Sequence, residues 1–245
     1  MKIQECVILV GGQGTRLKSV VSDIPKPMAD IGGKPFLEYL LCFLNNQGCS
    51  HCVLSVGYKH EVIENYFGNQ YLNIKLDYAI EEEPLGTGGG IKNSLRFIKE
   101  NNFFLLNGDS FFDVDLGSLA DFHFLTNSAI TLSVKEMCHV DRYGTLEIAN
   151  DRIIKFNEKK MIEKGLINAG VYAVSKSIFD EKYINKEKFS FEKDILEANL
   201  EILPFYAFQS DGYFIDIGIP EDYQKAQSEL KEIDYFSNFV NIEKQ

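Results

Sequence analysis

A glycine-rich loop directly after a short apolar strand is the feature that most restricts how this chain can fold. The run Cys6–Val10 is typical of a buried strand, and three glycines follow within four positions: Gly11, Gly12 and Gly14. Such a loop leaves backbone N–H groups uncovered, so it can wrap closely around a polyphosphate. Arg16 and Lys26, the latter between two prolines, add positive charge that suits phosphate oxygens.

Two familiar glycine motifs do not fit this loop. A dinucleotide fingerprint needs a third glycine, and Leu17 stands at that position. A P-loop ends in Gly-Lys-Ser or Gly-Lys-Thr, and the sequence contains neither triplet. The missing glycine, together with Arg16 and Lys26, argues against a dinucleotide-dependent oxidoreductase.

Predicted strands and helices alternate through the first half of the chain. Short apolar runs predict strands, and runs with helical periodicity predict helices. In chain order these are a strand at Cys6–Val10, a helix at Phe36–Asn46, a strand at Cys52–Val56, a helix at Glu61–Phe67, a strand at Ile74–Ala79, a helix at Gly88–Ile98 and a strand at Phe103–Leu106. This order predicts an α/β fold with a Rossmann-like mixed, mostly parallel sheet and helices on both faces. Ligands of such sheets bind at the carboxyl ends of strands, where the glycine loop and Asp109 both lie.

The second half of the chain has a less regular pattern. It predicts strands at Ile130–Lys135, Ala169–Ser175 and Tyr213–Ile217, a hairpin of Thr145–Ile148 and Ile153–Phe156 around Asn150-Asp151, and helices at Phe191–Asn199 and Pro220–Glu232. No linker composition separates the two halves. We therefore expect one domain over residues 1–233, with halves of about 1–125 and 126–233, and a tail over 234–245 that docks or frays.

Composition and charge restrict the partners. A net charge of −11 over 245 residues argues against nucleic acid as the main ligand. No apolar run approaches the roughly 20 residues that span a bilayer, and the apolar run near the start is too short for a signal peptide. The odd number of cysteines, five, suits reduced thiols. We expect no membrane partner and a cytoplasmic location, and the sequence leaves open a homo-oligomer.

The glycine loop carries a resemblance to a known family. Thr15-Arg16-Leu17 after the glycines, and the Pro-Lys-Pro triplet at its spacing, resemble the signature of sugar-1-phosphate nucleotidyltransferases. Lys18-Ser19 differs from the residue and proline that many members carry there. The resemblance extends from about Cys6 to Tyr223 and implies a GT-A-like nucleotidyltransferase fold. The implied reaction joins a nucleoside triphosphate and a sugar 1-phosphate and releases pyrophosphate, as in nucleotide-sugar biosynthesis for capsule or surface polysaccharides. The first half would then bind the nucleotide and the second the sugar phosphate.

The resemblance also implies which residues form the site. Because all reacting groups are anionic, the enzyme must neutralise charge, and carboxylates that hold a divalent ion serve this purpose. The implied catalytic residues are Arg16 and Lys26, and the implied Mg²⁺ ligands are Asp109 and Asp216, with Asp113, Asp115 and Asp222 ranked lower. The implied nucleotide-binding residues are Val10, Gly11, Gly12, Gly14, Thr15, Glu81, Glu82, Gly86, Thr87 and Asp109. Those for the sugar phosphate are Gly144, Glu158, Lys159, Asn168 and Glu192.

Three glutamates, Glu81 to Glu83, precede the glycine segment that is expected to admit a flat base. A carboxylate accepts two hydrogen bonds, and guanine offers two adjacent donors, so these residues favour GTP. The sequence motifs that contain Gly144, Glu158 and Asn168 are most similar to those of heptose-1-phosphate guanylyltransferases. This resemblance implies D-glycero-D-manno-heptose 1-phosphate as the sugar substrate and GDP-heptose as the product. The alternatives are a UTP- or CTP-dependent hexose-1-phosphate nucleotidyltransferase and a non-catalytic nucleotide-sugar sensor. A sensor would be expected to have lost Arg16, Lys26 or a metal aspartate.

Overall fold

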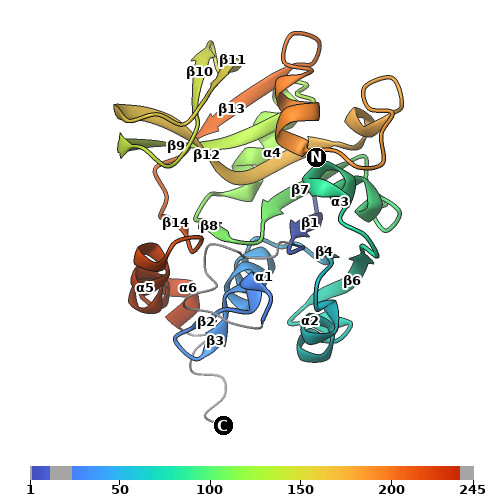
Figure 1. The fold of residues 1–245 in the computed structure, drawn as a ribbon, viewed down its shortest axis with the longest axis vertical. Coiled ribbons are helices and arrows are strands. Elements are labelled where there is room, and N and C mark those ends of the chain that lie inside the picture. Colours follow the sequence, from blue (N-terminus) through green and yellow to red (C-terminus); the bar gives the residue numbers. More distant parts are fainter. Residues whose placement is uncertain (1, 12–23, 238–245) are drawn as a thin grey trace.

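The computed structural model describes residues 2–11 and 24–237. Within these residues one sheet has the strand order β10-β11-β13-β9-β12-β7-β1-β4-β6-β5 (Figure 1). Its strands are β1 (Glu5–Leu9), β4 (His51–Val56), β5 (Gln70–Tyr71), β6 (Ile74–Ile80), β7 (Asn102–Asn107), β9 (Ile130–Val140), β10 (Thr145–Ala149), β11 (Arg152–Asn157), β12 (Ile162–Ser175) and β13 (Phe205–Gln209). Two short sheets pair β2 (Asp30–Ile31) with β3 (Lys34–Pro35), and β8 (Ser110–Phe112) with β14 (Phe214–Asp216).

The central part of the sheet, built from the first half of the chain, is parallel. β1 lies between β4 and β7, with Cys6 opposite Cys52 and Phe104, and β4 also pairs in parallel with β6. β12 instead runs antiparallel to β7 and β9, and β10 and β11 form an antiparallel hairpin. The predicted mixed sheet is confirmed. Parallel pairing predominates only in the first half, because strands of the second half are joined by short connections that favour antiparallel neighbours.

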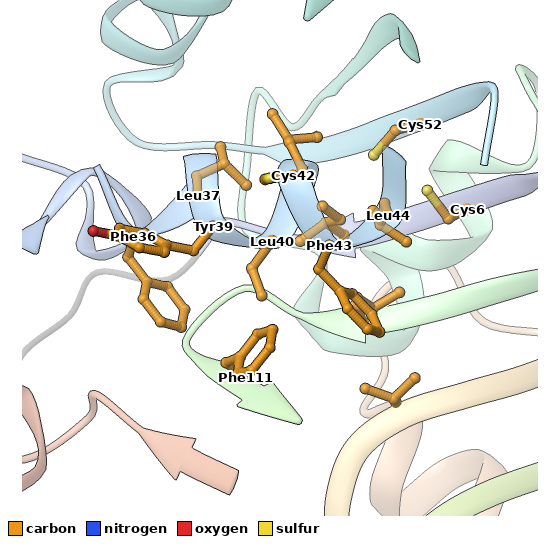
Figure 2. Packing of buried hydrophobic residues seen from close by; sticks show 14 of the residues in the cluster. Cys6, Phe36, Leu37, Tyr39, Leu40, Cys42, Phe43, Leu44, Cys52 and Phe111 are labelled. Atoms are coloured by element: carbon orange, nitrogen blue, oxygen red, sulfur yellow. The ribbon is translucent and has the colours of Figure 1, made fainter. Parts of the chain in front are cut away.

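Helices cover both faces of the sheet, as predicted. On β1, Cys6 and Ile8 pack into one core with α1, whereas Val7 packs into the other core with Ile91 of α3. Figure 2 shows the α1 side, where Phe43 meets Phe111 edge to face with ring centroids 5.5 Å apart.

The helices are α1 (Phe36–Asn46), α2 (His60–Phe67), α3 (Gly86–Ser94), α4 (Leu116–Leu125), α5 (Pro220–Glu229), α6 (Asp234–Ser237), a π-helix η4 (Phe191–Glu197) and the 3₁₀ turns η2 (Lys26–Met28), η3 (Lys176–Phe179) and η5 (Leu230–Glu232). None of the helices in the described ranges is long and apolar enough to cross a membrane.

Some predicted boundaries are confirmed and others are wrong. The helix Phe36–Asn46 is confirmed, as is the hairpin around Asn150 and Asp151, whose φ angles of 49° and 61° suit a type I′ turn. The helix predicted to reach Ile98 ends at Ser94. The strands predicted at 130–135 and 169–175 are too short, because β9 and β12 continue as a paired ribbon.

The beginning of the predicted tail is part of the core. Phe236 is fully buried and meets Tyr39 edge to face, with centroids 5.0 Å apart. The Tyr235 hydroxyl donates to Asp113 Oδ1 at 3.0 Å. Residues 234–237 therefore dock, and the predicted domain boundary at 233 falls inside a packed region.

His123 on α4 should make the protein sensitive to acid. Its ring is buried between Thr131 Oγ1 and Asn102 Oδ1, at 2.9 and 3.1 Å, and burial lowers its pKa to about 4. The ring is neutral in the fold, whereas the unfolded chain takes up a proton below pH ~6.5. The contribution of the neutral ring to the free energy of unfolding is therefore fully present above pH ~6.5 and is lost as the pH falls towards ~4. At pH 5 the loss is about 2 kcal/mol. Urea unfolding of the native protein and of His123→Gln at pH 7.5 and pH 5 should reveal this difference.

His139 provides the control because its side chain is exposed. His139→Asn should lose as much stability between the two pH values as the native protein does. An equal loss in His123→Gln would contradict the assignment of acid sensitivity to His123.

Candidate active site

The carboxyl ends of three parallel strands meet at one pocket of about 470 Å³. Leu9 ends β1, Asn107 ends β7, and Ser55 lies next to the last residue of β4. The remaining lining residues come from the loops that follow strands and from distant segments: Val10, Gly11, Lys26, Pro27, Glu81, Pro84, Gly86, Thr87, Gly108, Asp109 and Glu192. The topology therefore gathers the predicted nucleotide residues that are described, with the exception of Glu82.

Lys26 and Asp109 form an ion pair in this nucleotide pocket. Lys26 Nζ lies 2.6 Å from Asp109 Oδ2. Lys26 begins η2 between Pro25 and Pro27, and the two proline rings restrict the local backbone. The Lys26 side chain is 13% exposed and that of Asp109 is 44% exposed, so the ammonium is shielded while the carboxylate stays open to a ligand.

Asp216 approaches Lys26 from the other half of the chain, but it lines a separate cavity of about 180 Å³ and not the nucleotide pocket. β14 pairs antiparallel with β8, which sets Asp216 opposite Ser110. The Ile217 N–H donates to the Asp109 carbonyl at 3.0 Å. A Cβ on Gly218 would lie 2.9 Å from Lys26 Nζ and 2.7 Å from Asp216 Oδ1. The Lys26 ammonium is therefore close to both carboxylates, and glycine at 218 leaves room for them.

Both carboxylates have the chemistry of ligands for a divalent ion, and phosphate oxygens would have to complete its shell. Mg²⁺ at nucleotide sites is commonly held by one or two carboxylates, with phosphate and water oxygens completing its shell. Over residues 2–11 and 24–237, no group of three or more His, Cys, Asp or Glu side chains is arranged to hold a metal ion. Asp109 and Asp216 would thus provide two ligands and leave the other positions to substrate oxygens.

The three lower-ranked aspartates have other partners. Asp113 accepts from Tyr235, and Asp115 caps α4 by accepting from the Ser118 N–H at 2.7 Å. Asp222 lies 2.9 Å from Arg142 Nη1. Their contacts explain each of these carboxylates without a metal.

Of the glutamates that precede the glycine segment, Glu81 lines the nucleotide pocket. Its carboxylate accepts from Ser55 Oγ at 3.3 Å and from the Leu85 N–H at 2.9 Å. Glu82 is exposed and lies outside the pocket. The Glu81 N–H still donates to the Val56 carbonyl as an extension of β6, whereas the backbone bends at Glu82 and Glu83. The structure thus places Glu82 away from the predicted nucleotide site.

The glycines of α3 pack against the chain itself. A Cβ at Gly86 would lie 2.6 Å from the Phe189 carbonyl oxygen, one at Gly88 2.3 Å from the Phe189 ring, and one at Gly89 2.4 Å from the Glu187 carbonyl oxygen. Gly88 and Gly89 are buried beneath residues 187–189, so their missing side chains make room for this packing, and the approach of a flat base to the segment stays a prediction. Gly86 lines the pocket as well as touching Phe189.

A second pocket, of about 510 Å³, gathers the predicted sugar-phosphate residues. All five line it: Gly144, Glu158, Lys159, Asn168 and Glu192. Glu192 also lines the nucleotide pocket, so the two pockets meet at this side chain. Its Oε2 accepts from Thr87 Oγ1 at 2.8 Å and from Ser190 Oγ at 2.9 Å. Thr87 therefore links the nucleotide segment to the sugar-side π-helix.

Asn168 is held in place by a bulge in β12. The register with β9 shifts between Asn168 and Tyr172, and Gly170 within it has a φ of 79°. Asn168 Nδ2 donates to the Tyr172 hydroxyl at 2.8 Å, and its Oδ1 accepts from the Gly170 N–H at 3.1 Å. The bulge thus orients an amide side chain at the edge of the sugar-side pocket.

Sequence reasoning missed several pocket residues. Ser55 and Asn107 lie at strand ends, and the rule that singled out Asp109 could have found them. Tyr143, Leu196 and Glu197 line the sugar-side pocket, but only the folded hairpin and π-helix reveal their position. The predicted residues Gly12, Gly14, Thr15 and Arg16 lie outside the described residues, so their roles stay predictions.

A sequence model of the family described as Nucleotidyl transferase matches residues 5–233. The chain belongs to the nucleotidyl transferase family. Within it, the D-glycero-alpha-D-manno-heptose 1-phosphate guanylyltransferase of Aneurinibacillus thermoaerophilus is 52% identical over 227 residues, which cover 93% of this chain and 98% of that protein. The enzyme with the same name from Campylobacter jejuni subsp. jejuni serotype O:2 is 50% identical over 220 residues, which cover 89% and 96%.

A solved structure supports the same relationship. HddC from Yersinia pseudotuberculosis, in its complex with GMP-PN, is 42% identical and superposes with a TM-score of 0.84, covering 94% of this chain and 100% of that chain. The predicted nucleotidyltransferase fold is therefore confirmed. The two pockets of this nucleotidyl transferase lie in the matched region, since their lining residues fall between Leu9 and Glu197.

Proposed function

We propose that this nucleotidyl transferase joins GTP and D-glycero-α-D-manno-heptose 1-phosphate to give GDP-heptose and pyrophosphate, with Mg²⁺ as its cofactor. The proposal is supported mainly by one observation: the predicted nucleotide residues that are described, apart from Glu82, line one pocket, the predicted sugar-phosphate residues line a second, and Glu192 lines both. The two relatives that are half identical to this chain have names that specify the same sugar and nucleotide. A cytoplasmic location is part of the proposal.

The chemistry follows from the charges in the nucleotide pocket. A phosphate oxygen of the sugar phosphate attacks the α-phosphorus of GTP, and the bond from that phosphorus to the oxygen bridging it to the β-phosphate breaks. Pyrophosphate leaves with the bonding electrons. Lys26 is placed to neutralise charge that develops at the α-phosphate, and Arg16 is assigned to the leaving phosphates. A Mg²⁺ ion held by Asp109 and Asp216 would supply further charge neutralisation.

The sugar-side pocket supplies partners for hydroxyl groups. Glu158, Asn168 and Glu192 offer acceptors and donors that suit a pyranose, and Lys159 offers a cation for the phosphate. Lys159 and Glu158 lie at the end of the β10–β11 hairpin, opposite the π-helix that carries Glu192. This arrangement supports a sugar bound between the hairpin and the π-helix.

Native protein should prefer GTP to UTP, CTP and ATP by at least about tenfold in kcat/KM, equivalent to roughly 1.4 kcal/mol. The bonds from Ser55 and Leu85 fix the Glu81 carboxylate, and lone pairs remain for the two donors of guanine. Pyrophosphate release should be measured with each triphosphate and heptose 1-phosphate or mannose 1-phosphate. Glu81→Gln should reduce the preference for GTP.

Glu83→Gln is the matched control, because Glu83 is exposed and does not line the pocket. It should retain the preference of the native protein. Equal or better use of UTP or CTP by native protein would refute the guanine assignment and leave the reaction class standing. No pyrophosphate release with any pair of substrates would refute the reaction itself.

A further inference from the structure

An ion pair joins the segment before β10 to helix α5, outside the nucleotide and sugar-side pockets. Arg142 Nη1 lies 2.9 Å from Asp222 Oδ2. Arg142 precedes β10, whereas Asp222 lies in the first turn of α5, a few residues after Asp216. The Asp222 side chain is only 10% exposed, and Lys225 on the same helix is 3.5 Å away. Removal of Arg142, whose side chain is 40% exposed, would leave the largely buried Asp222 carboxylate with Lys225 as its remaining cation.

Tyr143 lies between this ion pair and the strand that carries Asp216. The Arg142 guanidinium carbon is 5.6 Å from the centroid of the Tyr143 ring. The ring also meets Phe214 edge to face, with centroids 5.8 Å apart and planes at 76°. Phe214 begins β14, and Asp216 ends it. Burial is the main cause that raises the pKa of the Tyr143 hydroxyl well above its usual range, and the negative charge of Asp216 is the second. The hydroxyl therefore stays neutral.

Tyr143 belongs to both environments. With Gly144 it lines the sugar-side pocket, and with Arg142, Asp216 and Asp222 it lines a separate small cavity of about 180 Å³. A Cβ at Gly144 would lie 2.8 Å from the Asn157 carbonyl oxygen, so this segment is also held closely against β11. Displacement of Tyr143 would thus alter the wall of the sugar-side pocket and the packing beside Asp216 together.

We propose that the Arg142–Asp222 ion pair holds Tyr143 against β14 and so couples sugar-phosphate binding to the position of Asp216. Arg142 and Asp222 are positioning residues in this scheme, because they act through Tyr143 and β14. The inference rests on the proposed function, since it assigns the sugar to the pocket that Tyr143 lines. It gives Asp222 a role other than that of a metal ligand.

Arg142→Ala should weaken binding of the sugar 1-phosphate by about tenfold, a typical size for coupling between sites. Binding of heptose 1-phosphate and of a non-hydrolysable GTP analogue should be measured by calorimetry in the presence of Mn²⁺. The affinity for the GTP analogue should not change. The affinity for Mn²⁺, measured by its paramagnetic resonance signal, should fall by about threefold. Asp222→Asn, which keeps the side-chain shape, should have the same effects. In turnover assays KM for the sugar 1-phosphate should rise more than kcat falls, and Arg142→Lys should restore part of the loss.

Lys164→Ala is the control, because Lys164 forms an exposed ion pair with Glu136 on the β9–β12 ribbon, 2.7 Å apart. It should leave all three affinities unchanged. If the two residues act as a pair, the double variant Arg142→Ala/Asp222→Asn should bind the sugar 1-phosphate no more weakly than either single variant. The inference would be overturned by affinity losses that add in the double variant, or by equal affinity losses for the sugar phosphate and the GTP analogue. It would also be overturned by a lower Tm with unchanged affinities. A native protein that binds neither heptose 1-phosphate nor the GTP analogue would instead overturn the proposed function.

Discussion

Asp109→Asn and Asp216→Asn should each lower kcat by about 10²-fold or more, because each removes a charge that stabilises the transition state. Asparagine keeps the size of the side chain but removes the negative charge that a divalent cation needs. Asp109 also loses its ion pair with Lys26, 2.6 Å away, so this variant combines two effects. Initial rates with GTP and heptose 1-phosphate over a range of Mg²⁺ concentrations measure both turnover and metal dependence.

Asp121→Asn serves as the control for these aspartates. Asp121 is exposed on α4, away from both pockets, and its variant should turn over at the native rate. The metal assignment predicts that higher Mg²⁺ does not restore full kcat to either site variant. Near-native turnover of Asp216→Asn at saturating Mg²⁺ would remove Asp216 from the metal site.

Lys26→Ala should lower kcat by about 10²- to 10³-fold with a smaller change in KM for GTP, the range found when one stabilising donor is removed from an active site. The reason is geometric as well as electrostatic. The ammonium is mostly shielded and close to both Asp109 and Asp216, where charge at the α-phosphate would develop. Single-turnover measurements at saturating GTP separate the chemical step from product release.

Lys155→Ala is a suitable control, because Lys155 is exposed, does not line the nucleotide pocket and pairs with Glu147 at 3.2 Å. It should show native kinetics. A Lys26→Ala variant that differs from native protein only in KM for GTP would mean that Lys26 binds the ground state, and its assignment to the transition state would be wrong.

Elements with a strong local pattern could be predicted from the sequence, and those set by distant partners could not. The helix Phe36–Asn46 has an apolar face and the hairpin has two residues that tolerate positive φ, so both follow from nearby residues. β8 and β13 were not predicted, because each becomes a strand only by pairing with a segment far away in sequence; β14 was predicted as a strand, but its pairing with β8 was not. The helix from Gly86 ends at Ser94, although apolar residues continue to Ile98, because periodicity alone does not locate a helix end.

The site could be predicted where chemistry is tied to strand ends. Asp109 lies two residues after the end of β7, and parallel strands bring their carboxyl ends to one edge, so its place in the pocket beside Val10 and Gly11 follows from topology. The choice between Glu81 and Glu82 could not be made, because it depends on how far the extended backbone continues beyond β6. The sequence also could not predict that the two pockets meet at Glu192, because this depends on the contact between Thr87 and the π-helix.

The crowding of Gly88 and Gly89 under residues 187–189 restricts how nucleobase preference could be redesigned. Any larger residue at these two positions would have to displace Phe189 or the backbone near Glu187, and with them the π-helix that carries Glu192. A library aimed at accepting another triphosphate should therefore keep both glycines fixed. Its diversity belongs at Glu81 and Pro84, which line the nucleotide pocket and do not themselves pack beneath residues 187–189.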